Sequence, residues 1–409
     1  MYSLLRRAAN ALAQDTMEFT RDLLRTPSPS LGEKGVAALV EQKMKEYGYN
    51  EVFSDECGNV VGILHGRDDE PTIVLNSHMD TVNADCSGEW TEKPYEATLR
   101  DGKLYGLGAA DCKGGLAAQV AAGAILRRSL LPLRGNLVVA ATVAEENGAS
   151  VGTRALLAKT LPSLDLRPQA VILGEPTSLG LYYGHDGWVE LELVVEGEEK
   201  QAVEQAARTI YDGLLQEEVQ ATMHAPNQEM QVREPVYSGG ADAHQARLRV
   251  HRRLGAPLQL EHVRGQLHRH AQLAASSGSK LVINVGVTEE AQTLYNGTQA
   301  FVQRVTDAWQ TDPFDRSFER ARQCLGSAGC PVRPGKWRLS RLGMGTAGGV
   351  ITREFGIPVF GYGPGDEEQA HQPNEYVDTN MLAEAAYGTA AIVHGLIGVP
   401  VLGWTADEI

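Results

Sequence analysis

Apolar runs of strand length alternate with helix-like spacing through the first 180 residues of the chain. Apolar positions three and four apart predict helices over roughly residues 4–25, 35–47 and 114–128. The strand-like runs are "NVVGIL", "PTIVLNS", "NLVVAATVA" and "AVILG", which are rich in valine. This alternation predicts an α/β fold, in which a sheet is packed by helices.

The pattern changes after the segment "YYGHDGW". The strands expected there are "WVELELVVEG", "EMQVREPVYS", "AHQARLRVHRRL" and "KLVINVGV", with helices over 199–217 and 259–277. The order βαββαβ is that of a small ferredoxin-like domain, and the alternation of its strands predicts a half-exposed sheet. After about residue 296 the first pattern returns, with "IPVFGY" as a strand and 380–396 as a helix. We therefore predict a large domain from residues 1–183 and 297–409, interrupted by a small inserted domain of residues 184–296.

Composition and charge narrow the classes of partner. The chain has 409 residues, of which 43% are hydrophobic, and a net charge of −15. Nucleic acids and anionic membranes need a basic face, so we expect neither as a partner. The longest apolar stretches fall short of the ~20 residues of a membrane span. Polar residues interrupt "MYSLLRRAANALAQDTMEF", so we expect an amphipathic helix of a cytoplasmic protein there and no signal peptide.

The cysteines are odd in number, scattered, and without a C-x-x-C pair. They are Cys57, Cys86, Cys112, Cys324 and Cys330. This spacing predicts neither a disulfide framework nor a cysteine zinc site, and most should be reduced thiols. The histidines of "HVRGQLHRH" (262–270) have no carboxylate partner in their segment, so we interpret them as the solvated face of a helix.

The segment "LNSHMDTVNAD" places His78 and Asp80 directly behind the apolar run "PTIVL". Residues two apart on an extended chain point to the same side. Taken alone, such a pair is more often a surface turn than a functional site. The rest of the chain has to decide between the two.

Acidic and histidine residues recur where other apolar runs end. Glu145 and Glu146 close one strand-like run, Glu175 closes another, and His371 lies in the loop after a further strand. Asp111 precedes the helix that begins near residue 114. Each residue alone would more often be a helix cap, a turn or a solvated loop. Ligands of open α/β sheets bind at the carboxyl ends of strands, so the shared position indicates one site.

Two histidines with several carboxylates suit divalent metal ions of the zinc type. Five ligands exceed one tetrahedral site and fit two ions that share a bridging carboxylate, for which Asp111 at a helix start is suited. The tandem glutamates suggest that one binds metal while the other takes a proton from water. Asp80 behind His78 would fix the tautomer of that histidine.

The motifs "SHMDTV", "LYGLGAADCKGGLAA", "AEENG", "GEPTS" and "GYGPGDEEQAHQPNEYV" occur in this order. With them the chain resembles the dinuclear zinc family of acetylornithine deacetylase, succinyl-diaminopimelate desuccinylase and glutamate-releasing carboxypeptidases. Its opening and the segment "VHRRL" are similar to a branch of selenium-metabolism-linked hydrolases. The resemblance implies a zinc-peptidase-like mixed sheet flanked by helices, with an inserted lid domain. It assigns His78 and Glu175 to one metal, Glu146 and His371 to the other, and Asp111 to both.

The same resemblance implies further roles. Glu145 would be the general base, and Asp80 would orient His78. Arg253 in "VHRRL" matches an arginine that often grips the substrate carboxylate, although a surface arginine on a lid strand is an equal alternative. The lid domain would form a homodimer.

The sequence departs from this family at three places. Relatives usually carry an oxyanion-stabilising histidine after the first lid strand, and "VVEGEEKQAVEQAARTIY" has none. Ala347 stands where relatives often have Asn or Asp, and His251 where the lid strand usually has Asp. We expect either an unusual substrate or a replacement by His224 or His244.

The whole pattern predicts a metal-dependent hydrolase that cleaves an amide bond of an N-acyl amino acid or a dipeptide. It would hold two divalent ions per chain, Zn²⁺ first and Co²⁺ or Mn²⁺ as alternatives. Its substrate would be a small amide with a free carboxylate. Two alternatives stay open, namely a metal-dependent exopeptidase and a catalytically weak paralogue that binds metal and ligand.

Overall fold

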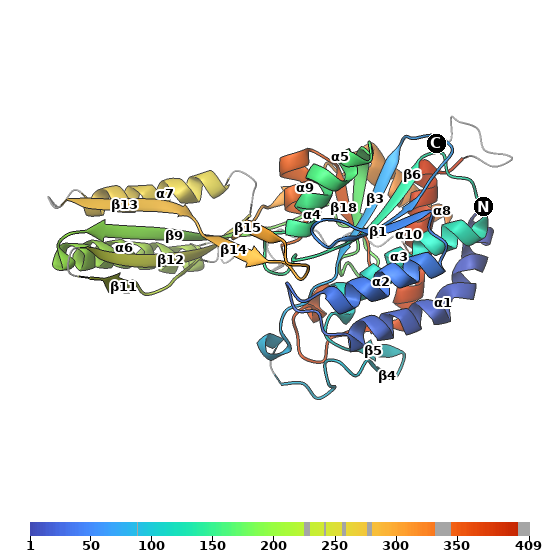
Figure 1. The fold of residues 1–409 in the computed structure, drawn as a ribbon, viewed down its shortest axis with the longest axis horizontal. Coiled ribbons are helices and arrows are strands. Elements are labelled where there is room, and N and C mark those ends of the chain that lie inside the picture. The colour runs from blue at the N-terminus through green and yellow to red at the C-terminus, as the bar shows by residue number, and fades with distance from the viewer. Residues whose placement is uncertain are drawn as a thin grey trace.

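We describe a computed structural model of the chain. It describes residues 1–87, 89–224, 230–240, 243–255, 259–275, 280–331 and 345–399. Figure 1 shows an elongated molecule, in which a larger part surrounds one sheet and a smaller layer projects from it.

The larger part is built on a six-stranded sheet with the order β1-β2-β6-β3-β7-β18. These strands are β1 (Glu51–Ser54), β2 (Val60–Leu64), β3 (Thr72–His78), β6 (Asn136–Thr142), β7 (Pro168–Leu173) and β18 (Val359–Gly361). The four strands β6, β3, β7 and β18 run parallel, whereas β2 pairs antiparallel with β6, and β1 pairs antiparallel with β2. The carboxyl ends of the four parallel strands therefore meet at one edge of the sheet.

Helices cover both faces of this sheet (Figure 1). One face packs against α1 (Tyr2–Arg25), α2 (Lys34–Glu46), α3 (Gly114–Ser129), α8 (Arg316–Ser327) and α10 (Thr379–Ile397). The other carries α4 (Val151–Ala155), the π-helical turn η3 (Leu156–Thr160), α5 (Leu161–Ser163) and α9 (Gly348–Phe355). Successive strand residues serve opposite faces, because Ile73 and Leu75 join the first core and Val74 joins the second.

Short elements complete the larger part. They are η1 (Ala84–Ser87), β4 (Thr98–Arg100), β5 (Lys103–Tyr105), η2 (Ala109–Lys113), β8 (Gly184–His185), β17 (Trp309–Gln310), η4 (Glu367–Gln369) and β19 (Tyr376–Asp378). Strands β19, β5 and β4 form a small sheet, and β17 pairs with β8.

The projecting part, which we call the small layer, has its own sheet and core. Its strands are β9 (Gly187–Gly197), β10 (Met230–Val232), β11 (Val236–Gly239), β12 (His244–Leu254), β13 (Leu281–Val287) and β16 (Val305–Thr306). They form the antiparallel order β10-β12-β9-β13, and β11 and β16 pair with β12 and β9. Helices α6 (Lys200–His224) and α7 (Gln259–Ala275) pack against it through a separate apolar cluster.

The element order of the small layer follows the predicted one, with one difference. The segment predicted as a single strand, "EMQVREPVYS", forms two short strands, β10 and β11, with Pro235 between them. Proline has no amide hydrogen to donate to the neighbouring strand, so the pairing with β12 is interrupted there.

A hairpin connects the small layer back to the larger part. It consists of β14 (Glu289–Thr293) and β15 (Gln299–Gln303). At its turn, the Tyr295 hydroxyl donates a hydrogen bond to the Gly58 carbonyl at 2.9 Å, and the Asn296 amide donates to the Glu56 carbonyl at 2.9 Å. The small layer is thus held to the larger part by contacts as well as by chain connections.

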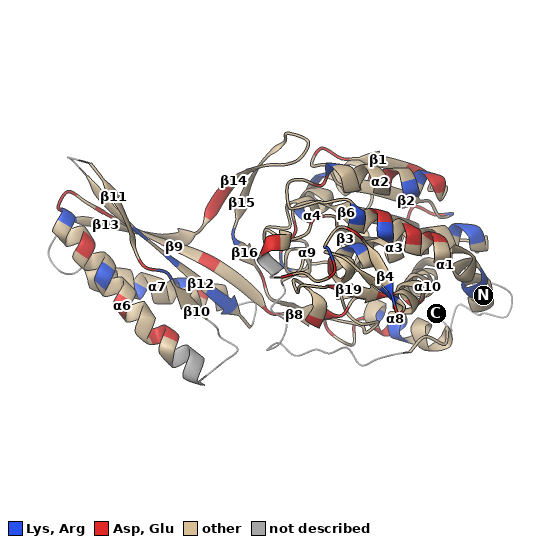
Figure 2. Cartoon of the chain, turned by 90° about the horizontal axis from the view of Figure 1, so that it is seen from below, with Lys and Arg blue, Asp and Glu red and all other residues tan. Residues whose placement is uncertain are grey.

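Two expectations about the whole chain can be compared with the structure. No helix in the described ranges is long and apolar enough to cross a membrane. Figure 2 shows that acidic and basic residues both occur along the two parts of the chain. Cys57, Cys112, Cys324 and Cys330 are free thiols. That these thiols stay reduced in the cell remains a prediction.

Candidate metal centre

The predicted site residues gather where the parallel strands end. His78 is the last residue of β3, and Glu175 follows β7 by two residues. Glu145 and Glu146 follow β6, and His371 lies in the loop after β18. Asp111 belongs to the turn η2, which leads into α3.

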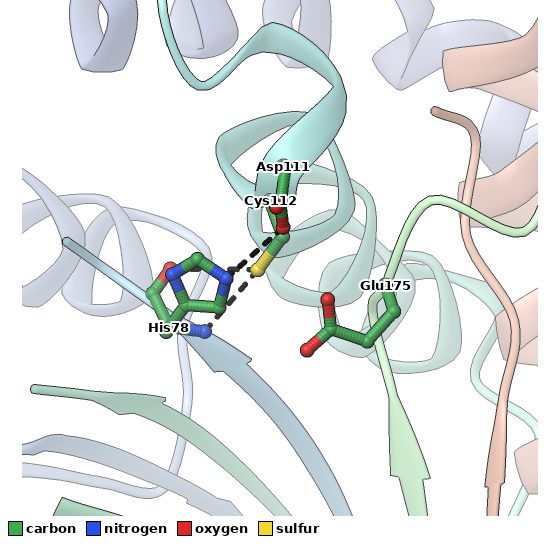
Figure 3. Close-up of side chains that lie close together, drawn as sticks. All are labelled: His78, Asp111, Cys112 and Glu175. Carbon is green, nitrogen blue, oxygen red and sulfur yellow. Dashed lines mark hydrogen bonds and ion pairs between the residues drawn. The ribbon is translucent and has the colours of Figure 1, made fainter. Parts of the chain in front are cut away.

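Two groups of side chains have the composition and spacing of metal-binding sites. In the first, the ligand atoms of four buried residues lie within 4.8 Å of one another: His78, Asp111, Cys112 and Glu175. The second joins Asp111, Glu146 and His371 within the same limit. Figure 3 shows the first group around one space.

Asp111 belongs to both groups. One of its carboxylate oxygens lies 3.2 Å from Nε2 of His78, and the other lies 3.3 Å from Nε2 of His371. Two ions held ~3.5–4 Å apart need a shared ligand of this kind. The peptide bond that follows Asp111 is cis.

A main-chain contact orients the ring of His78. Its Nδ1 lies 2.9 Å from the backbone carbonyl oxygen of Asp80, so Nδ1 carries the hydrogen and donates it. The nearer carboxylate oxygen of Asp80 is 3.6 Å away. Nε2 of His78 is therefore left facing Asp111, as a metal ligand requires.

The Asp80 carboxylate contacts the turn with the tandem glutamates. It accepts hydrogen bonds from the backbone amides of Glu145 and Glu146 at 3.1 and 3.0 Å. The Ser30 hydroxyl donates to it at 2.6 Å. Asp80 thus positions His78 through its main chain and the two glutamates through its side chain.

The turn after β6 needs a glycine at Gly148. Its φ is +82°, and a Cβ added there would lie 2.1 Å from the ring of Trp188, the second residue of β9. The same turn carries Glu146, whose carboxylate lies 2.8 Å from Nε2 of His371. The close approach of Trp188 therefore places the start of the small layer against the turn that carries the tandem glutamates.

Sequence reasoning missed Glu375, which holds the turn of Asp111. Its buried carboxylate accepts hydrogen bonds from the backbone amides of Gly108, Ala110 and Asp111 at 2.8, 2.7 and 2.9 Å. The available signal was its place four residues after His371, inside the motif "HQPNEYV". Because all three amides converge on one side chain, Glu375 holds the turn that carries Asp111 in place.

Close helix packing also places Asp111. A Cβ at Gly115, in the first turn of α3, would lie 1.6 Å from the carbonyl oxygen of Gly174 next to Glu175. The buried ammonium of Lys113 donates to the carbonyl oxygens of Leu23 and Thr26 at 3.0 and 2.8 Å. The start of α3 is thereby fixed against both β7 and the end of α1.

The electrostatics of the centre favour bound cations. Burial raises the pKa of Glu145 well above its usual range, and burial with the nearby Asp111 and Glu146 raises the pKa of Glu175 to about 8. Burial disfavours the protonated form of His371, but hydrogen bonds to Asp111 and Glu146 raise its pKa to about 11. These buried carboxylates need positive charge nearby, and divalent ions supply it. The donor set therefore fits the metals that the sequence indicates.

Cys112 is a second residue that sequence reasoning left out. Its Sγ is fully buried and accepts a hydrogen bond from the backbone amide of His78 at 3.3 Å (Figure 3). Burial raises the pKa of its thiol to about 12. Cys112 lacks the paired spacing that marks cysteine metal sites in a sequence, so only its spatial neighbours reveal its position.

Arg253 lies outside both donor groups. Its Nε is 3.2 Å from a carboxylate oxygen of Asp186, a buried residue whose pKa is raised to about 6 by burial against the lowering effect of Arg253. The neighbouring His185 accepts a hydrogen bond at Nε2 from the Thr346 amide at 2.8 Å. His185, Thr346, Glu175, Tyr182 and Trp309 line a small cavity beside the first donor group.

The other residues singled out in the sequence belong to neither donor group. His244 begins β12, whereas Leu254 at the other end of that strand pairs with Gly187. Ten residues of strand separate the two ends by about 33 Å. The side chain of His224 lies outside the described residues. Ala347 is buried before α9, and the ring of His251 stacks on Trp188 at 5.5 Å.

The histidine-rich segment 262–270 lies on α7 in the small layer. His262 and His268 are exposed, and His270 pairs with Glu217 of α6 at 3.0 Å. The interpretation as a solvated helix face is confirmed for the first two, while the third forms an interhelical contact.

The chain is similar in sequence and in fold to known metallopeptidases and related proteins. The model of "Peptidase family M20/M25/M40" matches residues 74–308. Escherichia coli K12 YgeY, described as uncharacterized, is 27% identical over 431 aligned residues, which cover 100% of this chain and 98% of YgeY. Succinyl-diaminopimelate desuccinylase 2 of Ruegeria sp. TM1040 is 34% identical over 192 residues, covering 45% of this chain and 48% of that enzyme. Bacillus subtilis YxeP, described as a dinuclear metal-binding peptidase, has a similar fold, with a TM-score of 0.67 at 17% identity over 95% of this chain and 99% of YxeP.

Proposed function

This chain belongs to peptidase family M20/M25/M40, and from that premise we propose that it hydrolyses the amide bond of an N-acyl amino acid or a dipeptide. It is a metal-dependent hydrolase of amide bonds. We assign two divalent cations to each chain, with Zn²⁺ as the first choice and Co²⁺ or Mn²⁺ as alternatives. Imidazole and carboxylate ligands suit zinc among these ions.

One observation carries the proposal, namely that Asp111 is shared by two donor groups at the carboxyl edge of parallel strands. Two cations bound there would acidify a water molecule and polarise the amide carbonyl. His78 and Glu175 are proposed for the first cation, and Glu146 and His371 for the second.

Glu145 is the proposed general base. Its buried carboxylate has His78, Glu175 and Glu146 as charged neighbours, so it lies beside the donor groups, where a general base has to act. It takes a proton from the attacking water as the carbon–oxygen bond forms. It then delivers this proton to the amide nitrogen as the carbon–nitrogen bond breaks.

The proposed substrate carries a free carboxylate close to the scissile amide. Arg253 is its proposed partner, because a guanidinium binds a carboxylate through two parallel hydrogen bonds. The pairing of Arg253 with Asp186 means that the substrate carboxylate would have to replace that contact. Comparison of N-acetyl, N-succinyl and dipeptide substrates separates a deacylase from an exopeptidase.

We further propose a cytoplasmic homodimer that forms through the small layer. The free thiols favour a reducing compartment. The edge strands of the small layer expose Val236, Tyr237 and Val282 at 68%, 46% and 57% of their surfaces. Sedimentation of the wild-type protein and of Val282→Glu tests the dimer, since a buried charge at the interface would separate the protomers.

The decisive experiment replaces Glu145 by glutamine in zinc-loaded protein. The amide keeps the size of the side chain but accepts no proton, so turnover should fall by about 10²–10⁴-fold. Metal analysis should still find two ions per chain, because Glu145 is proposed as base and not as ligand.

The matched control is Glu199→Gln, an exposed glutamate just before α6, which should leave turnover unchanged. Near-normal turnover of Glu145→Gln would refute its role as base and direct attention to Glu146. Absence of bound divalent ions in fully active protein would refute the proposed function.

A further inference from the structure

The first donor group contains a thiol beside its imidazole and carboxylates. We propose that Sγ of Cys112 is a ligand of the cation held by His78, Asp111 and Glu175, so that the two metal positions differ in chemistry. This inference rests on the proposed function, because it concerns the same cations.

The geometry of the group supports a fourth ligand. Sγ of Cys112 lies within 4.8 Å of the ligand atoms of the other three residues. Figure 3 shows the sulfur beside His78, facing the space that the Glu175 carboxylate also approaches. A zinc ion with bonds of ~2.0–2.3 Å to nitrogen, oxygen and sulfur holds its ligand atoms within such separations.

The surroundings of Cys112 differ from those of an ordinary core cysteine. Cys330 belongs to the apolar core cluster of the larger part. Like the buried Cys324, the fully buried Cys112 belongs to none of the three apolar clusters formed by the described residues, so its charged neighbours are what distinguish it. Its charged neighbours are His78, Glu175 and Asp111. A buried thiol among metal-binding side chains has a use as a ligand that apolar packing does not explain.

Coordination changes the thiol in a defined way. The S–H bond breaks, the proton leaves to solvent, and the sulfur electron pair forms the bond to the cation. A soft thiolate favours Zn²⁺ and Cd²⁺ over Mn²⁺. The second group offers only nitrogen and oxygen atoms from Asp111, Glu146 and His371. The first position should therefore select for soft ions and the second should not.

The first test uses wild-type protein that has been stripped with a chelator and loaded with ¹¹³Cd²⁺. Two resonances per chain are expected, one of them shifted strongly downfield as sulfur ligation requires, and the other in the nitrogen–oxygen range. Two resonances that both fall in the nitrogen–oxygen range would overturn the proposal while leaving the dinuclear site intact. Failure to bind any Cd²⁺, Co²⁺ or Zn²⁺ would overturn the proposed function together with this inference.

The second test uses Co²⁺, whose visible bands report that the ion is bound and whose near-ultraviolet charge-transfer band reports a sulfur ligand. Cys112→Ser should lose the charge-transfer band, keep visible bands, and bind Cd²⁺ at least about tenfold more weakly, with a smaller change for Mn²⁺. Cys57→Ser, which removes a half-buried thiol elsewhere, should retain the band. A charge-transfer band that persists in Cys112→Ser would refute the assignment.

Discussion

Asp80 is a buried residue whose contacts hold several side chains of the candidate site in place. Its carboxylate accepts from Ser30 and from the amides of Glu145 and Glu146, and its carbonyl oxygen accepts from His78. Removing a buried acceptor that serves three donors destabilises the fold, because each buried donor left without a partner lowers the free energy of unfolding by about 1–3 kcal/mol. We therefore expect Asp80 to contribute to stability as well as to the proposed catalysis.

We expect Asp80→Asn to lower both turnover and stability. The asparagine side chain has only one acceptor oxygen. Its amino group would face a hydrogen-bond donor to which the carboxylate of Asp80 is now the acceptor. Denaturant unfolding should show a loss of about 1–3 kcal/mol, and kcat should fall. Ser30→Ala is the matched comparison, since it removes one donor and should cost about 1 kcal/mol. Equal stability of the wild type and Asp80→Asn would contradict this role.

The residues predicted from the sequence share a position that a linear pattern reveals. His78, Glu145 and Glu175 each follow an apolar run, and the ends of parallel strands lie at one edge. Glu375 and Cys112 act through neighbours that are distant in the chain or hidden inside a motif. Their proposed roles follow from the amides and ligand atoms that surround them in space. The spacing of residues along the sequence does not predict these neighbours.

At the scale of elements, the neutral side chain of His185 joins β8 to the loop before α9 through hydrogen bonds. Nδ1 of His185 donates to the Asp186 carbonyl at 2.7 Å, and Nε2 accepts from the Thr346 amide. Burial lowers the pKa of His185 to about 4. A proton on Nε2 would abolish its acceptance from that amide.

This junction predicts a dependence of stability on pH. Between the unfolded pKa of about 6.5 and the folded value near 4, only the unfolded chain gains the proton, so stability falls as pH falls by up to about 1.4 kcal/mol per unit. His185→Gln keeps an acceptor but does not titrate. The melting temperature of its metal-free form should therefore drop less between pH 7 and 5 than that of metal-free wild type.

The exposed His268→Gln on α7 provides the control, and it should keep the wild-type drop. A His185→Gln protein with the same loss of melting temperature as wild type would show that other groups dominate the acid response.

Most elements follow from apolar periodicity, and the exceptions have local causes. The helix predicted over 114–128 forms as Gly114–Ser129. The helix predicted over 199–217 continues to His224, because the period of apolar positions does not mark where a helix ends. The division into β10 and β11 follows from Pro235. The alternation of apolar and polar residues continues across this proline and therefore predicted a single strand.

At the scale of the whole molecule, the two parts have separate apolar cores, and they differ in whether they contain the proposed metal ligands. The donor groups belong to the larger part, and the small layer packs around its own cluster. The change of strand pattern after "YYGHDGW" predicts an inserted layer. The sequence did not predict how this layer packs against the larger part, because contacts such as that of Trp188 with Gly148 join segments that are distant in the chain.

Chelation should therefore lower the melting temperature of the larger part selectively. Ions that bind only the folded state stabilise it by about 4 kcal/mol at a thousandfold excess over Kd. Calorimetry with and without chelator should shift one transition and leave that of the small layer in place. His371→Ala, which lacks a proposed ligand, should show a smaller shift, and identical scans with and without chelator would contradict the prediction.

The position of His371 after the small layer has a consequence for synthesis. The residues of the first donor group have all been translated once residue 175 has been added, whereas the second group waits for residue 371. The ribosome must make the entire projecting layer between these two events. The first group waits as well, because Glu375 holds the turn of Asp111, so both proposed metal positions can be completed only near the end of translation.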